Sequence, residues 1–130
     1  SVATFIIPGK PLMIIGPHGS GVEYTAREAV KYINLKIASI NIALIGYEYS
    51  LTEVQSKIKS LSGNTVLLFS EIQYLQSKSI EDMILHEMSN PDRQTIITGI
   101  KCNSTKIISK VNEIFNMTVS FKDWASSFGN

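Results

Sequence analysis

Several residue types that mark specialised proteins are scarce in this chain. Only one of the 130 residues is cysteine, Cys102, so an internal disulfide framework is excluded and a reducing compartment is expected. Only two residues are arginine, Arg27 and Arg93, although arginine is the side chain that grips phosphate groups bidentately. The formal net charge of +1 gives no electrostatic footprint for nucleic acid or for a membrane surface.

Long apolar runs are absent as well. No run approaches the roughly 18 residues that span a bilayer, and no signal peptide is visible. We therefore expect a cytoplasmic protein without membrane contact. Hydrophobic residues make up 44% of the sequence and charged residues 18%, a balance that is typical of a globular domain and excludes a disordered chain.

Two patterns of apolar residues, one typical of strands and one typical of helices, alternate along the chain. Short apolar or β-branched runs, as in buried strands, cover residues 11–15, 36–45, 65–69, 95–98 and 117–121. Segments with apolar residues three and four positions apart, as in amphipathic helices, cover residues 23–33, 51–61, 79–88 and 104–115. This alternation predicts an α/β domain in which a five-stranded parallel sheet lies between layers of helices.

The most informative motif is a glycine-rich loop between the first expected strand and the first expected helix. Gly16 and Gly21 have the spacing of the phosphate-binding motif G-x-x-x-x-G-K-[ST], and the motif requires this strand–loop–helix context. Val22 replaces the lysine that reaches the β- and γ-phosphates, and Glu23 replaces the hydroxyl residue that holds Mg²⁺. The candidate nucleotide-binding residues of this degenerate loop are Gly16, Pro17, His18, Gly19, Ser20, Gly21, Val22 and Glu23.

A second altered position follows the apolar strand at 65–69. In P-loop ATPases such a strand ends in Asp-Glu, where the Asp orders the Mg²⁺ shell and the Glu polarises the attacking water. Here the pair is Ser70-Glu71, so the metal-side carboxylate is missing. A carboxylate at Glu23 would also repel bound phosphates. We therefore expect ATPase activity to be lost and assign no metal ligands, with Glu71 as the one candidate catalytic base.

Further segments match one protein family in order along the chain. Residues 44–48 read Leu-Ile-Gly-Tyr-Glu against Leu-Phe-Gly-His-Glu. Residues 63–72 read Gly-Asn-Thr-Val-Leu-Leu-Phe-Ser-Glu-Ile against Gly-Gly-Thr-Leu-Phe-Leu-Asp-Glu-Ile. Residues 93–97 match a strand that carries a sensor residue, and residues 115–119 match a Leu-Asn-Val run. In these segments the chain resembles the α/β subdomain of an AAA+ ATPase, specifically the central, sigma-54 interaction domain of bacterial sigma-54-dependent transcriptional activators. The resemblance implies a three-layer P-loop fold, ATP binding, and a role in transcription regulation such as that of a response regulator.

The departures from this family define the expected function. The loop that touches the sigma factor does not follow Glu48, the arginine fingers have no counterpart within residues 101–116, and the sensor position near Thr98 or Ile100 is not matched in type. The resemblance thus implies a non-hydrolysing AAA+ domain that acts through protein partners or self-association, with weakened binding of ATP and Mg²⁺. Residues 1–130 would be a single subdomain of a longer protein, without the helical lid, and DNA would be bound only by a domain outside this chain.

Other interpretations stay open. A functional or partner-activated ATPase would use Glu71 as base and receive the missing groups in trans. A ligand-sensing module would bind another anionic nucleotide in the emptied loop, and a non-catalytic clamp-loader subunit is a related branch of the same family. The plainest interpretation is a strand-to-helix turn without a ligand, with His18 solvated at its tip and Cys102 an incidental thiol.

Overall fold

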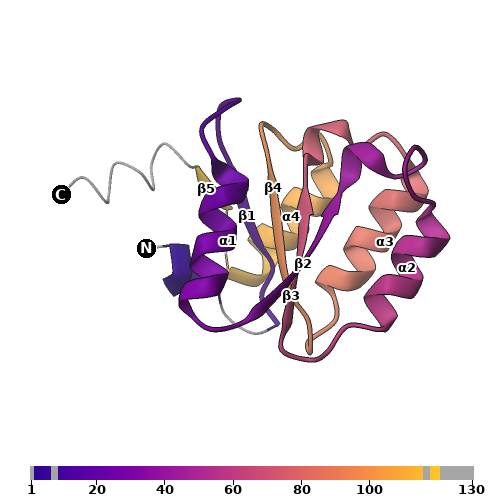
Figure 1. Ribbon diagram of the computed structural model, residues 1–130. Helices are drawn as coiled ribbons and strands as arrows, with labels where there is room; N and C mark the ends of the chain where they lie inside the picture. Colours follow the sequence, from indigo (N-terminus) through magenta and orange to yellow (C-terminus); the bar gives the residue numbers. More distant parts are fainter. Residues whose placement is uncertain (1, 7–8, 116–117, 121–130) are drawn as a thin grey trace.

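The computed structural model describes residues 2–6, 9–115 and 118–120, in which strands and helices alternate around a parallel sheet (Figure 1). The strands are β1 (Leu12–Ile15), β2 (Lys36–Asn41), β3 (Thr65–Ser70), β4 (Gln94–Gly99) and β5 (Thr118–Ser120). The α-helices are α1 (Val22–Tyr32), α2 (Leu51–Lys59), α3 (Lys78–Met88) and α4 (Thr105–Phe115). Short 3₁₀ turns are η1 (Val2–Phe5), η2 (Ile42–Leu44) and η3 (Ile72–Tyr74). The predicted α/β class with parallel strand pairing is confirmed.

The strand order is β2-β3-β4-β1-β5, with the short β5 pairing with the far side of β1. Every residue of β3 and β4 is buried, which explains why both sequences are almost continuously apolar or β-branched. In the register Leu12 lies opposite Ile96, and Leu68 lies opposite Ile96 from the other side. The order leaves β4 between β1 and β3, so the connections that follow these three strands meet at one edge of the sheet.

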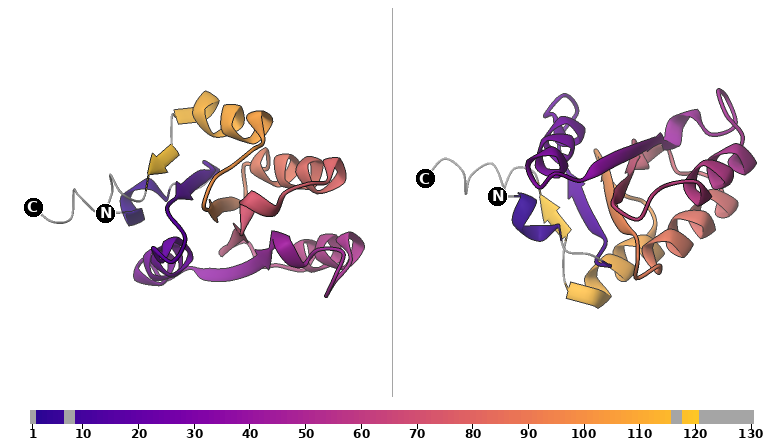
Figure 2. Two further views of the ribbon diagram at one scale, coloured as in Figure 1. Left: turned by 90° about the horizontal axis from the view of Figure 1, so that it is seen from above. Right: turned by 60° about the horizontal axis from the view of Figure 1, so that its bottom comes forward.

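Helices cover both faces of the sheet (Figure 2). Helix α1 lies on one face, together with η1, and α4 lies on the other. Helix α3 packs beside α4, and α2 lies beside α3, because residues of both helices line one cavity. The connection from β1 to β2 runs across the sheet in one direction, and the connections from β2 to β3, β3 to β4 and β4 to β5 run in the other. Because crossovers between parallel strands are right-handed, the first helix and the later helices lie on opposite faces. Among the residues that the structure describes, no helix has the length and apolar character needed to cross a membrane.

Two elements end at least two residues earlier than the sequence predicts. The strand expected over residues 36–45 ends at Asn41, whose side chain accepts a hydrogen bond from the Ala43 N–H and so starts the turn η2. The helix expected over residues 51–61 ends at Lys59. Ser50 is its N-cap, and Ser50 and Glu53 form a reciprocal capping box. The last predicted strand, over residues 117–121, is β5 within the described residues 118–120.

Candidate functional site

The glycine-rich loop connects β1 to α1 at the carboxyl edge of the sheet. Gly19 and Gly21 have φ angles of 78° and 82°, in the left-handed region that glycine adopts without steric cost. The N–H and the hydroxyl of Ser20 both donate to the carbonyl of Pro17, at 3.0 and 2.6 Å, and close the loop on itself. The N–H of Gly16 donates to the carbonyl of Gly99 at 3.1 Å, which ties the loop to the end of β4.

The first turn of α1 follows this loop directly. Gly21 is its N-cap and supplies no side-chain hydrogen bond. The first amides of any helix have no acceptor within that helix, and together with the helix dipole they attract anions. The backbone before α1 thus has two left-handed glycines and a first turn without a side-chain cap. His18 is exposed in this loop, as the plainest interpretation predicted.

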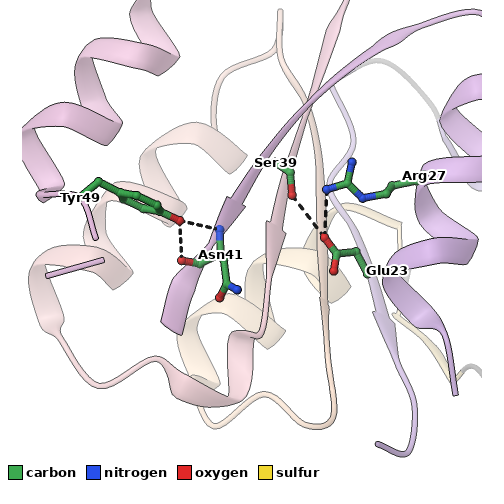
Figure 3. A network of polar contacts seen from close by, with 5 residues as sticks. All are labelled: Glu23, Arg27, Ser39, Asn41 and Tyr49. Carbon is green, nitrogen blue, oxygen red and sulfur yellow. Dashed lines mark hydrogen bonds and ion pairs between the residues drawn. The ribbon is translucent and has the colours of Figure 1, made fainter. Parts of the chain in front are cut away.

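The side chains in the first turn of α1 differ from those of the phosphate-binding motif. The half-buried Val22 packs against the hydrophobic core where the motif has a lysine. The Glu23 carboxylate accepts hydrogen bonds from Arg27 Nη2 at 3.1 Å and from Ser39 Oγ at 3.4 Å (Figure 3). Glu23 thus occupies the position of the Mg²⁺-binding hydroxyl and is engaged with α1 and β2 instead.

The end of β3 lies on the other side of β4 from the loop. Ser70, where the motif has a metal-binding carboxylate, is 2% exposed and brings no charge to this edge. Glu71 has a left-handed backbone (φ 60°), and its Oε2 accepts a hydrogen bond from Gln73 Nε2 at 2.7 Å. Gln73 Oε1 in turn accepts from the Ile100 N–H at 3.1 Å. The one candidate base is therefore held beside the end of β4.

Gly99 permits this close approach of η3 to β4. A Cβ atom at Gly99 would lie 2.5 Å from Gln73 Oε1 and 2.7 Å from Ile72 Cγ2. The sensor position gives no polar side chain at the same edge, because Thr98 is 1% exposed within β4 and Ile100 is apolar. Glu71 is thus the only acidic or basic side chain that residues 70–73 and 98–100 bring to this edge.

Both arginines are bound to other groups of the protein. Arg27 pairs with Glu23. Arg93 Nη1 donates to the carbonyls of Ser62 and Thr65, at 3.2 and 2.9 Å, at the amino end of β3 and β4. That end is opposite to the edge that carries the loop, so Arg93 joins two strand starts and does not reach a ligand at Gly16–Glu23.

Cys102 is a free, partly buried thiol. Burial raises the pKa of the Cys102 thiol, whose Sγ lies 3.8 Å from the Ser104 carbonyl, so the thiol stays protonated at neutral pH. Within residues 2–6, 9–115 and 118–120 no three His, Cys, Asp or Glu side chains gather as metal ligands.

Three residues that the sequence argument missed organise this region. Ser39 and Gln73 hold the two carboxylates, and Tyr49 binds the end of β2. The contact of Gln73 with Glu71 could be suspected from the sequence, because the two residues lie two positions apart in the same turn. Ser39 and Tyr49 had none, because their contacts depend on how the strands are placed.

No protein-family model matches this chain. No curated protein matches it significantly either.

Proposed function

We propose that this chain is a degenerate AAA+-like domain of a transcription regulator, which does not hydrolyse ATP and acts through protein–protein contacts. The observation that carries the proposal is the contact set of Glu23. The left-handed glycines before α1 are compatible with a phosphate-binding loop, but the residue at the Mg²⁺-binding position of the motif is a carboxylate bound to Arg27 and Ser39. Loss of the second metal position at Ser70 supports the same conclusion independently.

The finer fold assignment, a three-layer P-loop domain with five strands, is supported by the placement of the motifs. The Gly16–Glu23 loop follows β1 and the Ser70-Glu71 pair follows β3, on either side of β4. In P-loop ATPases the first motif cradles the phosphates, and both motifs supply groups to the same Mg²⁺, so the two motifs must end at one edge of the sheet. The likeness to sigma-54-dependent activators rests on residues 44–48, 63–72, 93–97 and 115–119. The first of these segments lies between β2 and α2, and the second contains β3.

Exposed aromatic residues support a function in protein contacts. Four of the five tyrosines are exposed large hydrophobic side chains; they are Tyr24 (68%), Tyr32 (82%), Tyr47 (88%) and Tyr74 (54%). Tyrosine is enriched at protein interfaces, because its rigid ring buries a large area and its hydroxyl still finds a partner.

A titration with a fluorescent ATP analogue, with and without Mg²⁺, tests the loss of nucleotide chemistry, together with a phosphate-release assay on the same sample. We expect no phosphate release and no increase of affinity on addition of Mg²⁺. Tight Mg²⁺-dependent binding, with turnover that Glu71→Gln abolishes, would overturn the proposal in favour of an active ATPase.

A second candidate function is metal-independent binding of another anionic nucleotide. The uncapped first turn of α1 after two left-handed glycines favours it, since these amides attract an anion without Mg²⁺. The same titration, repeated with a cyclic dinucleotide and with inorganic phosphate in the presence of EDTA, separates this function from a turn without a ligand.

A further inference from the structure

Strand β2 is an edge strand of the sheet: one side of it pairs with β3, and its other side is the outer edge. The N–H of Lys36 donates to the Asn64 carbonyl on the β3 side, at 3.2 Å. In a parallel ladder the backbone groups of alternate residues face the same neighbour. The groups of Lys36, Ala38 and Ile40 therefore face β3. Those of the residues between them, Ile37, Ser39 and Asn41, face away from the sheet.

Tyr49 occupies one end of this outward edge. Its hydroxyl accepts a hydrogen bond from the Asn41 N–H at 3.0 Å and donates to the Asn41 carbonyl at 2.9 Å (Figure 3). A strand that pairs with β2 therefore cannot use Asn41. Ile37 and Ser39 carry the outward backbone groups that such a strand can use.

Two apolar cavities border this part of β2. One, of about 520 Å³, lies between α1 and the start of β2 and is lined by residues that include Tyr24, Glu28, Lys31 and Ile37. The other, of about 190 Å³, lies between β2 and α2 and is lined by Ser39, Ile40, Tyr49, Glu53, Val54 and Lys57. Side chains from an added strand would therefore find a recess beside β2 at either end.

Protection against strand addition is weak at this edge. Natural edge strands use prolines, bulges or several charged residues to prevent pairing with another chain. The sequence of β2 is Lys-Ile-Ala-Ser-Ile-Asn, with no proline and with one charged residue at its first position. An unprotected edge between apolar recesses is the feature that strand addition uses for recognition.

We propose that the β2 edge pairs with β2 of a second copy of this chain, antiparallel about a two-fold axis at Ala38. This inference deepens the proposed function, on which it rests, by naming the surface and the partner of one protein contact. Ile37 of one copy then lies opposite Ser39 of the other, and about four hydrogen bonds join the chains. Ala38 meets its own symmetry mate at the non-hydrogen-bonded position, where side chains approach closely and a methyl group fits.

Charge favours a second copy over an unrelated peptide. A two-fold axis reverses the direction of each flanking helix, so a surface must be complementary to its own reversed image. On α2 the exposed Glu53 and Lys57 are four residues apart, and reversal sets Glu53 against Lys57 of the second copy. On α1 the exposed Glu28 and Lys31 are three residues apart, and reversal likewise sets Glu28 against Lys31 of the second copy. Both helices that border the edge thus have acid and base in a self-complementary order.

Sedimentation velocity over a concentration series tests the pairing with Ser39→Pro. The Ser39 N–H faces outward, and proline is tolerated at such positions of edge strands, so β2 keeps its pairing with β3. We expect a wild-type dimer whose dissociation constant rises about tenfold or more in Ser39→Pro. Ser39→Ala, which removes only the hydroxyl, is the matched control and should leave the dimer intact.

A charge exchange gives a second test that does not depend on the strand itself. Lys57→Glu and Glu53→Lys each set like charges together in a homodimer, so each variant alone should be more monomeric than wild type. An equimolar mixture of the two variants restores both contacts and should dimerise. Circular dichroism checks the fold of both variants, since Glu53 also belongs to the Ser50 capping box.

Three results would overturn the inference: a monomer at all concentrations, a dimer that Ser39→Pro leaves unchanged, or a mixture no more dimeric than its components. Binding of an unrelated extended peptide to a monomeric wild type would assign the edge to another partner. None of these results bears on nucleotide binding, so the inference can fail while the loss of ATPase chemistry holds, and the reverse.

Discussion

The hydroxyl of Tyr49 bonds to both backbone groups of Asn41, accepting from its N–H at 3.0 Å and donating to its carbonyl at 2.9 Å. One side chain therefore replaces a neighbouring strand at the last residue of β2. This contact and the Asn41 cap on η2 together explain why β2 ends there, although the apolar sequence continues.

Replacement of Tyr49 by phenylalanine should weaken this end of the sheet. Both hydrogen bonds are lost and two partly buried backbone groups are left without that partner, so we expect a decrease of about 1–2 kcal/mol in the free energy of unfolding. Urea denaturation measures it. Tyr47→Phe is the matched control, because Tyr47 is 88% exposed, and it should change stability by less than about 0.5 kcal/mol. Equal effects in the two variants would contradict the assigned role of Tyr49.

Gly99→Ala should destabilise the fold through a steric contact at the candidate site. The new Cβ would lie 2.5 Å from Gln73 Oε1 and 3.0 Å from the Ile72 backbone nitrogen, so η3 has to move. We expect a loss of about 1–3 kcal/mol in thermal or urea unfolding. The control is Gly63→Ala, where a Cβ meets nothing within 4 Å, and which should be neutral or stabilising by up to about 1 kcal/mol. If Gly99→Ala is as stable as wild type, η3 and β4 are not in close contact.

Much of the fold could be predicted because its signals are local. The strand at Thr65–Ser70 is apolar at nearly every position, since both of its faces are buried, and Ser50 precedes an amphipathic stripe with Glu53 at capping-box spacing. The end of β2 could not be predicted, because it depends on Tyr49, eight residues later in the sequence.

The candidate site likewise combines local features that the sequence predicts with long-range contacts that it does not predict. The replacements at Val22 and Glu23 are visible in the motif itself, and a Glu23–Arg27 pair fits ordinary helical spacing. The contact of Glu23 with Ser39 joins residues 16 positions apart, and that of Gln73 with Ile100 joins residues 27 positions apart. Contacts of this kind depend on strand order and register, which composition and periodicity do not specify.

The Cys102 thiol should titrate above its ordinary pKa of 9.0, because burial disfavours the thiolate. Since the folded-state pKa exceeds that of the unfolded chain, the thiol contributes stability below the unfolded pKa, and this is lost as pH rises through the folded value. The rate of iodoacetamide labelling, followed by mass spectrometry against pH, should have its midpoint above 9.0. Labelling in denaturant gives the reference, and a folded-state midpoint below that reference would contradict the prediction.

Restoring the two motif side chains should restore affinity for a nucleotide. In the double variant Val22→Lys, Glu23→Thr, the loop backbone is unchanged, a cation can reach the phosphates, and a hydroxyl replaces the repelling carboxylate. We expect Mg²⁺-dependent binding of a fluorescent ATP analogue to strengthen about tenfold or more, because charge-assisted hydrogen bonds to phosphate are the strong ones. Phosphate release should stay absent, since Ser70 still lacks the metal-side carboxylate. The controls are Val22→Leu and Glu23→Gln, which change packing and charge without supplying the motif groups. A folded double variant with no gain in affinity would mean that the glycine loop is a strand-to-helix turn and not a phosphate cradle that has lost its side chains.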